Sequence, residues 1–214
     1  MNDNVLIPYR NREKWGFCKP DKAIVIPCNY DDVDWFQEGI AKVKKNEKYG
    51  FINKEGLTIT HCIYDWVWNF NNGHVAVQKN GKWGVINKEG KEVVSCIYDG
   101  ADYEYGGIGV DNHSIYNDKF KEGYARVKKN GKYGFINKEG KEVIHCIYNY
   151  AHNFHEDYAR VNKNDKWGFI NKEGIEVIPC IYNKVSDFHE GYARAGKNGK
   201  CGYINISGVK YWED

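Results

Sequence analysis

The amino-acid sequence predicts an all-β protein built from a tandem repeat, and two observations carry this prediction. An aromatic–glycine step recurs along the chain at a regular interval, from Trp15 to Tyr49 and again from Tyr49 to Trp83. Aromatic residues make up 15% of the 214 residues and are accompanied by 23 glycines, a composition that favours short strands joined by tight turns. We therefore expect about six three-stranded β units in an open, solenoid-like stack, with a propeller-like curl as the alternative.

The repeat is defined by the aromatic–glycine step at its start. The step occurs at Trp15-Gly16, Tyr49-Gly50, Trp83-Gly84, Tyr133-Gly134 and Trp167-Gly168, and Cys201-Gly202 is a degenerate sixth copy. The interval from Trp83 to Tyr133 is longer than the others, which predicts an insertion within the loop 100–119. In the copy from Tyr133 we expect strands at 133–137 and 141–148 and from Tyr158 to the turn at Asn164. Asn-Gly pairs at Asn80, Asn130 and Asn198 predict type I′ hairpins.

We interpret residues 1–214 as a single array with a cap at each end. Residues 1–14 are expected to supply an N-terminal cap strand, and 201–214 a truncated C-terminal cap repeat. The 31 basic and 29 acidic residues nearly cancel, so the net charge of +2 implies no global attraction to nucleic acid or membrane. No apolar run approaches the roughly 20 residues of a membrane span, and the first ten residues lack a signal-peptide core, so we expect a cytoplasmic protein.

The repeat also resembles a known family. Residues 166–182 read Lys-Trp-Gly-Phe-Ile-Asn-Lys-Glu-Gly followed by Ile-Glu-Val-Ile-Pro-Cys-Ile-Tyr, which is similar to the bacterial WG β-repeat, or KWG-repeat, family. The resemblance extends from about Lys14 to Gly208; the insertion and Cys201 depart from it. It implies a tandem β array with no established catalytic residues. We therefore expect no enzymatic activity, no metal and no cofactor.

Cysteines and aromatic residues recur in register, which predicts that they form the core. Five cysteines occupy one position of the repeat, each at the same distance after its aromatic, and we expect them to be buried and reduced: Cys28, Cys62, Cys96, Cys146 and Cys180. The matching aromatics are Tyr30, Tyr64, Tyr98, Tyr148 and Tyr182, with Phe36, Phe70, Phe120, Phe154 and Phe188. A stacking platform for single-stranded nucleic acid is the alternative interpretation of these rings. His61 and His145 directly precede two of these cysteines, but neighbours on a strand point to opposite faces, so we expect them at the surface.

Two sets of residues are candidates for partner contact. The first combines the tyrosine-rich insertion with the C-terminal tip, as a surface for another protein or a homodimer: Tyr103, Tyr105, His113, Tyr116, Tyr211 and Trp212. The second is a basic stripe along the hairpins, for phosphates or an acidic partner: Lys44, Lys45, Arg126, Lys128, Lys129, Arg160, Lys163 and Arg194. A solvated charged face, with the glutamates Glu55, Glu89, Glu139 and Glu173, is the alternative to a functional stripe.

These patterns favour a protein-interaction or scaffolding module, an accessory subunit of a larger bacterial assembly. A nucleic-acid-associated protein that binds phosphates through the basic stripe is the second hypothesis. A hydrolase with its site in the insertion is the third.

Overall fold

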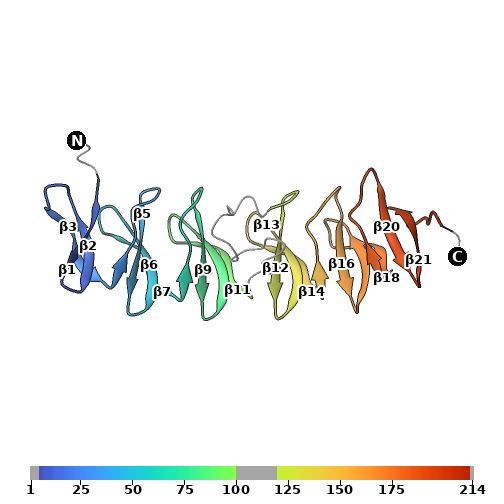
Figure 1. Cartoon of the computed structure of the whole chain (residues 1–214), viewed down its shortest axis with the longest axis horizontal. Helices are drawn as coiled ribbons and strands as arrows, with labels where there is room; N and C mark the ends of the chain where they lie inside the picture. The colour runs from blue at the N-terminus through green and yellow to red at the C-terminus, as the bar shows by residue number, and fades with distance from the viewer. Residues whose placement is uncertain (1–4, 100–119, 213–214) are drawn as a thin grey trace. The chain divides into compact units, whose positions relative to one another are not determined.

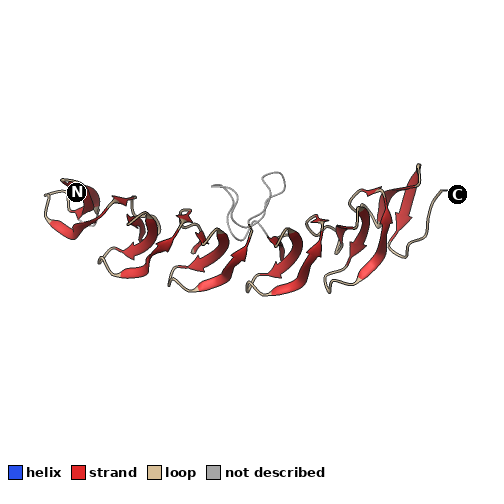
Figure 2. Ribbon diagram, turned by 90° about the horizontal axis from the view of Figure 1, so that it is seen from below, coloured by secondary structure: helices blue, strands red, loops and turns tan. Residues whose placement is uncertain are grey.

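The computed structural model describes residues 5–99 and 120–212, and in these ranges it contains strands and turns but no helix (Figure 2). The chain divides into two compact units, Met1–Ile97 and Tyr98–Asp214, which are described separately. The candidate contact residues of the insertion, Tyr103, Tyr105, His113 and Tyr116, lie outside the described ranges.

The first unit contains three antiparallel sheets that follow one another along the chain (Figure 1). Sheet 1 comprises β1 (Ile7–Asn11), β2 (Lys14–Cys18) and β3 (Ile24–Tyr30). Sheet 2 comprises β4 (Asp32–Val33), β5 (Ile40–Lys45), β6 (Lys48–Asn53) and β7 (Thr58–Tyr64). Sheet 3 comprises β8 (Trp66–Val67), β9 (His74–Lys79), β10 (Lys82–Asn87) and β11 (Glu92–Tyr98).

The second unit repeats this plan. Sheet 4 comprises β12 (Tyr124–Lys129), β13 (Lys132–Asn137) and β14 (Glu142–Tyr148). Sheet 5 comprises β15 (Tyr150–Ala151), β16 (Ala159–Lys163), β17 (Lys166–Ile170) and β18 (Glu176–Tyr182). Sheet 6 comprises β19 (Lys184–Val185), β20 (Tyr192–Lys197) and β21 (Lys200–Asn205). Every described sheet is open, with two edges, so the predicted tandem array of all-β units is confirmed.

Each sheet joins the end of one sequence repeat to the start of the next. In sheet 5 the hairpin pairs Ala159 with Ile170 and Lys163 with Lys166, so the last strand of one repeat lies beside the first strand of the following repeat. A two-residue strand precedes the hairpin in sheets 2, 3, 5 and 6, and the sequence pattern did not predict it. In sheet 1 the strand β1 takes the hairpin position beside β2.

The glycine of the aromatic–glycine step is required by a close crossing of strands. A Cβ at Gly168 would lie 2.4 Å from the carbonyl oxygen of Ile178 and 2.7 Å from the nitrogen of Cys180. The register of β17 and β18 shifts at this point, between Trp167 and Phe169. With no side chain in the way, the Sγ of Cys180 reaches past β17 to the carbonyl oxygen of Val161, 3.7 Å away. The sheet is therefore strongly curled around the glycine.

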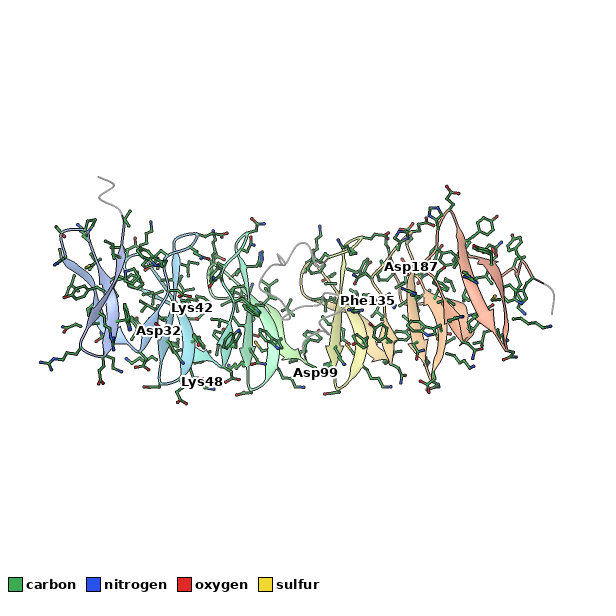
Figure 3. The ribbon with its side chains drawn as sticks, viewed as in Figure 1. Asp32, Lys42, Lys48, Asp99, Phe135 and Asp187 are labelled. Carbon is green, nitrogen blue, oxygen red and sulfur yellow. The ribbon has the colours of Figure 1, made fainter. Side chains whose placement is uncertain are left out.

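The hydrophobic core lies between consecutive sheets of a unit. Phe135 (labelled in Figure 3) is fully buried, and its ring centroid lies 4.9 Å from that of Phe154, in the loop between β15 and β16 of the next sheet. Equivalent pairs are Phe17–Phe36, Phe51–Phe70 and Phe169–Phe188, at 4.7, 5.0 and 4.5 Å. Of the predicted core aromatics, Tyr64, Tyr98, Tyr148 and Tyr182 are buried with Phe70, Phe120, Phe154 and Phe188, whereas Tyr30 and Phe36 are only half-buried.

The prediction that the five recurring cysteines are buried is wrong in degree. Cys28, Cys62, Cys96, Cys146 and Cys180 are free thiols, but each is only half-buried, while Cys62, Cys96 and Cys180 pack against buried core residues. Burial, as the largest cause, raises the pKa of Cys96 to about 11 and the pKa values of Cys146 and Cys180 to about 12. These thiols therefore stay protonated at neutral pH, which makes them poor nucleophiles.

Candidate interaction surface

Glutamates in left-handed turns tie consecutive sheets together. Glu38, whose φ is 51°, accepts hydrogen bonds from the backbone nitrogens of Asn72 and Gly73 in the next sheet, at 2.9 and 3.1 Å. Lys88 lies 2.9 Å from the same carboxylate. In the second unit Glu156 accepts from the nitrogens of Glu190 and Gly191 at 2.9 and 3.1 Å. These bonds hold the sheets in the register on which the surface side chains depend.

A cluster of rings and cations spans the junction of sheets 2 and 3. The Lys42 Nζ lies 5.8 Å from the ring centroid of Tyr49, and the Tyr49 ring lies 5.9 Å from that of Trp66. Trp66 in turn meets Trp68 edge-on at 6.0 Å. Trp66 is 45% exposed despite these contacts. We call Lys42, Tyr49, Trp66 and Trp68 the first aromatic–cation cluster.

Equivalent residues form a more buried cluster at the junction of sheets 4 and 5. The guanidinium carbon of Arg126 lies 5.3 Å from the ring centroid of Tyr133 and 5.8 Å from that of Tyr150. The two rings lie 5.1 Å apart. Arg126 Nη1 donates a hydrogen bond of 2.6 Å to the carbonyl oxygen of Ala151. The arginine thus joins two sheets through its planar group and its charge.

Arg160 plays the same part between sheets 5 and 6. Its Nη1 donates to the carbonyl oxygen of Val185 at 3.0 Å, and its Nε lies 2.8 Å from a carboxylate oxygen of Asp187. Its Nη2 lies 3.2 Å from His152 Nδ1, and the His152 ring packs on Trp167 at 5.7 Å. Burial first, and then the charge of Arg160, lowers the pKa of His152 to about 4, so this histidine is neutral at pH 7. Arg126, Tyr133, Tyr150, His152, Arg160 and Trp167 form the second aromatic–cation cluster.

The repeat seen in the sequence corresponds to a known family. The sequence profile described as "WG containing repeat" matches residues 15–49, 49–83, 83–110, 118–133, 133–167 and 167–201. The chain belongs to the WG repeat family. A solved structure entitled "Crystal structure of the eukaryotic initiation factor" is similar with a TM-score of 0.35 and 10% sequence identity, over 94% of this chain and 60% of that chain. The chain thus spans about three fifths of that protein's length, and no curated protein matches it.

The basic stripe expected along the WG-repeat hairpins is not continuous. Arg126 is 1% exposed and is bound between two sheets, so its inclusion in a phosphate-binding stripe is wrong. Arg160 is engaged with sheet 6. Lys44 and Lys128 lie over the rings of Tyr49 and Tyr133, at 5.3 and 5.0 Å. Lys129 is half-buried, 4.0 Å from Glu142, and Lys45, Lys163 and Arg194 are exposed.

The C-terminal tip also differs from the expectation of an exposed aromatic pair. Trp212 is half-buried, because it folds back over Gly202, where a Cβ would lie 2.8 Å from the indole ring, and packs on Tyr182 at 6.4 Å. It therefore takes the position that the Cys-Ile-Tyr strand holds in the other WG repeats. Tyr211 meets the ring of Tyr192 edge-on at 5.4 Å and is 52% exposed.

The remaining candidate features of the WG repeats are the histidines beside the cysteines, metal sites and membrane-spanning helices. His61 and His145 are exposed, and His145 Nδ1 lies 2.9 Å from Glu142. Within residues 5–99 and 120–212, no three histidine, cysteine, aspartate or glutamate side chains gather as a metal site would require. No helix long and apolar enough to cross a membrane is found in the same ranges.

The aromatic–cation clusters were not predicted as such. In the sequence, the rings at Tyr49, Tyr133 and Trp167 mark the repeat, and the cations resemble a stripe along the hairpins. Trp66, Tyr150 and His152 belong to the two-residue strands or follow them directly, where no periodic pattern distinguishes a residue. The spacing of the rings could have revealed the clusters, because the same number of residues separates Tyr49 from Tyr133 and Trp66 from Tyr150.

Proposed function

We propose that this WG-repeat chain is a non-enzymatic interaction module that binds another protein through its first aromatic–cation cluster. The exposure of Trp66 carries the proposal. Its ring is held by Tyr49 and Trp68 but remains 45% accessible beside Lys42. A large ring that is both oriented and accessible loses little conformational freedom on binding, and tryptophan and tyrosine dominate the energetic centres of protein interfaces.

The difference between constant core residues and variable surface residues supports this proposal. The interlocking phenylalanines between sheets recur almost unchanged, whereas the cluster positions vary from junction to junction. Lys42, Tyr49 and Trp66 at one junction correspond to Arg160, Trp167 and Lys184 at another. The surface can therefore change its chemistry without loss of the core. On this proposal the chain serves as an accessory subunit, and the rings of its surface select the partner.

Nucleic acid is the second candidate, because lysines beside accessible rings also suit stacked bases and phosphates. Lys42 and Lys44 both lie over Tyr49. However, Asp34 pairs with Lys42 at 2.7 Å, and Asp32 (labelled with Lys42 in Figure 3) lines the same shallow depression. Carboxylates at this position repel phosphate groups, so a protein partner is favoured over nucleic acid.

The proposal is tested by replacing Trp66. We expect Trp66→Ala to lose most of the proteins that the wild-type chain captures from its native host, as identified by mass spectrometry. Leu57→Ala is the matched control, because Leu57 is 64% exposed at a turn of the same sheet pair and lies outside the cluster. Circular dichroism should show both variants folded. Partners that bind Trp66→Ala and wild type equally would refute the proposal.

A single-stranded oligonucleotide titration distinguishes the two candidates. For a protein-binding module, we expect no binding at physiological salt. Salt-dependent binding that weakens in Trp66→Ala would favour the nucleic-acid candidate instead, since each phosphate contact releases counterions.

A further inference from the structure

Sheet 6 contains a hollow in its surface. It has a volume of about 200 Å³ and is lined by residues of β19, β20 and β21, among them Lys184, Ser186, Arg194, Gly196 and Cys201. Arg194 and Cys201 are exposed within it.

The same positions in sheet 5 are filled by rings. The counterparts of the lining residues one repeat earlier are Tyr150, His152, Arg160, Asn162 and Trp167. There the rings of Tyr150, His152 and Trp167 touch one another, with centroids 5.2 to 5.9 Å apart. In sheet 6 lysine, serine and cysteine replace these three rings, and glycine replaces the asparagine. The hollow thus occupies the space that three rings fill in sheet 5.

The arginine of the cluster is retained. Arg126 stacks on two rings and Arg160 donates to a main-chain carbonyl of the next sheet, Val185. Arg194 occupies the equivalent position, but its Nη2 lies 3.9 Å from the Sγ of Cys201, a weak partner for a guanidinium. Its planar group is therefore available in the position from which the other two arginines bind rings and carbonyls.

We infer that this hollow binds one aromatic side chain, tryptophan or tyrosine, of a protein partner. The ring stacks on Arg194 over Cys201, and Arg194 donates a hydrogen bond to the adjacent main-chain carbonyl of the partner. The inference rests on the proposed function, because it assigns a partner residue to the same type of surface. It adds the identity of the recognised group and a second location for it.

Size and charge favour a protein side chain as the occupant. Sites for small molecules usually measure about 300–1,000 Å³, so a hollow of about 200 Å³ holds a single ring and little else. Among the described residues that line it, Lys184 and Arg194 are cationic and none is acidic. An aromatic residue flanked by an acidic one fits both the shape and the charge.

The site can be tested with N-acetyl-L-tryptophanamide, which carries an indole ring and an amide carbonyl. In a ¹H–¹⁵N NMR titration of the whole chain, we expect saturable shifts of the Arg194, Gly196 and Cys201 amides, with a Kd on the order of 1–10 mM for a single side chain. N-acetyl-L-alaninamide at the same concentrations should leave these amides unmoved. Shifts that are absent, or equal for both amides, would overturn the inference.

Filling the hollow provides the matched variants. Cys201→Trp restores the ring that the other repeats carry, and we expect it to abolish the tryptophanamide shifts. If this variant does not fold, Gly196→Asn serves instead, since the nearest atoms to a Cβ there are those of the Lys184 side chain, at 3.4 Å or more, and one backbone oxygen at 3.6 Å. Arg194→Lys keeps the charge without the planar group, and we expect at least a tenfold weaker Kd. Undiminished binding by a folded filled variant would refute the site.

Two further outcomes separate this inference from its alternatives. Sedimentation that shows a wild-type dimer, dissolved by Cys201→Trp, would identify the occupant as a second copy and overturn the assignment to a different partner. If the filled variant retains all captured partners while Trp66→Ala loses them, the inference about the hollow fails and the proposed function stands.

Discussion

At the scale of single residues, the backbone of a crossing strand is the reason that every complete repeat carries a glycine after its aromatic. The glycines after the aromatic were evident in the sequence, but only the structure shows that a crossing strand leaves no space for a Cβ at Gly134. The cations were likewise evident, and their exposure was misjudged at Arg126. The period of the repeat aligns positions between copies, yet it does not reveal whether the next sheet covers a given side chain.

Replacing the crossing glycine should therefore destabilise the second unit. A Cβ at Gly134 would lie 2.4 Å from the carbonyl oxygen of Ile144 and 2.7 Å from the nitrogen of Cys146, and backbone atoms cannot easily move aside. We expect Gly134→Ala to lower the free energy of unfolding by roughly 1–3 kcal/mol in urea, as overpacking does. Gly196→Ala, whose nearest neighbour is a flexible lysine at 3.4 Å, should stay within about 0.5 kcal/mol of wild type. Equal losses in the two variants would contradict the role of the crossing strand.

At the scale of elements, the strands and hairpins follow from local sequence chemistry. Apolar alternation and the Asn-Gly pairs predicted the three main strands of each repeat, because both signals act within a few residues. The two-residue strands escaped prediction, since two residues carry no period. The bonds between sheets escaped it as well: Glu38 and Asn72 are a full repeat apart, and no local pattern links a carboxylate to amides so distant.

The glutamate bonds between sheets should make stability depend on pH. Lys88 first, and the Gly73 and Asn72 amides next among the favourable partners, hold the pKa of Glu38 below its usual value. A carboxyl group whose pKa is lowered by folding contributes stability above its unfolded pKa, and this contribution is lost as the pH falls through the folded pKa. We expect Glu38→Gln to reduce the loss of thermal stability between pH 6 and about pH 3.

The comparison for this prediction is Glu55→Gln, at an exposed turn of the same sheet. This variant should keep the wild-type dependence of Tm on pH. An unchanged dependence in Glu38→Gln would show that the bonds between the turns contribute nothing measurable.

At the scale of the whole molecule, the tandem plan and the family were predictable because repetition multiplies a weak signal. Five copies of one pattern establish a β array where a single copy would be ambiguous. Repetition makes the function harder to predict. Repetition identifies the residues that every sheet needs for folding, whereas binding depends on the residues in which the sheets differ, such as Trp66 and Cys201.

The packing of Trp212 on sheet 6 yields the last prediction. In repeat proteins each unit contacts only its neighbours, so the loss of a contact within one sheet is felt locally. Trp212 covers Gly202 and packs on Tyr182 and the core beneath. We expect Trp212→Ala to increase amide hydrogen exchange in β20 and β21 while β16 and β17 of sheet 5 keep their protection. Tyr211→Ala, at a 52% exposed side chain, should have the smaller effect. Faster exchange spread evenly over sheets 4, 5 and 6 would contradict a local effect, and exchange equal to wild type would show that the packing of Trp212 contributes nothing measurable to sheet 6.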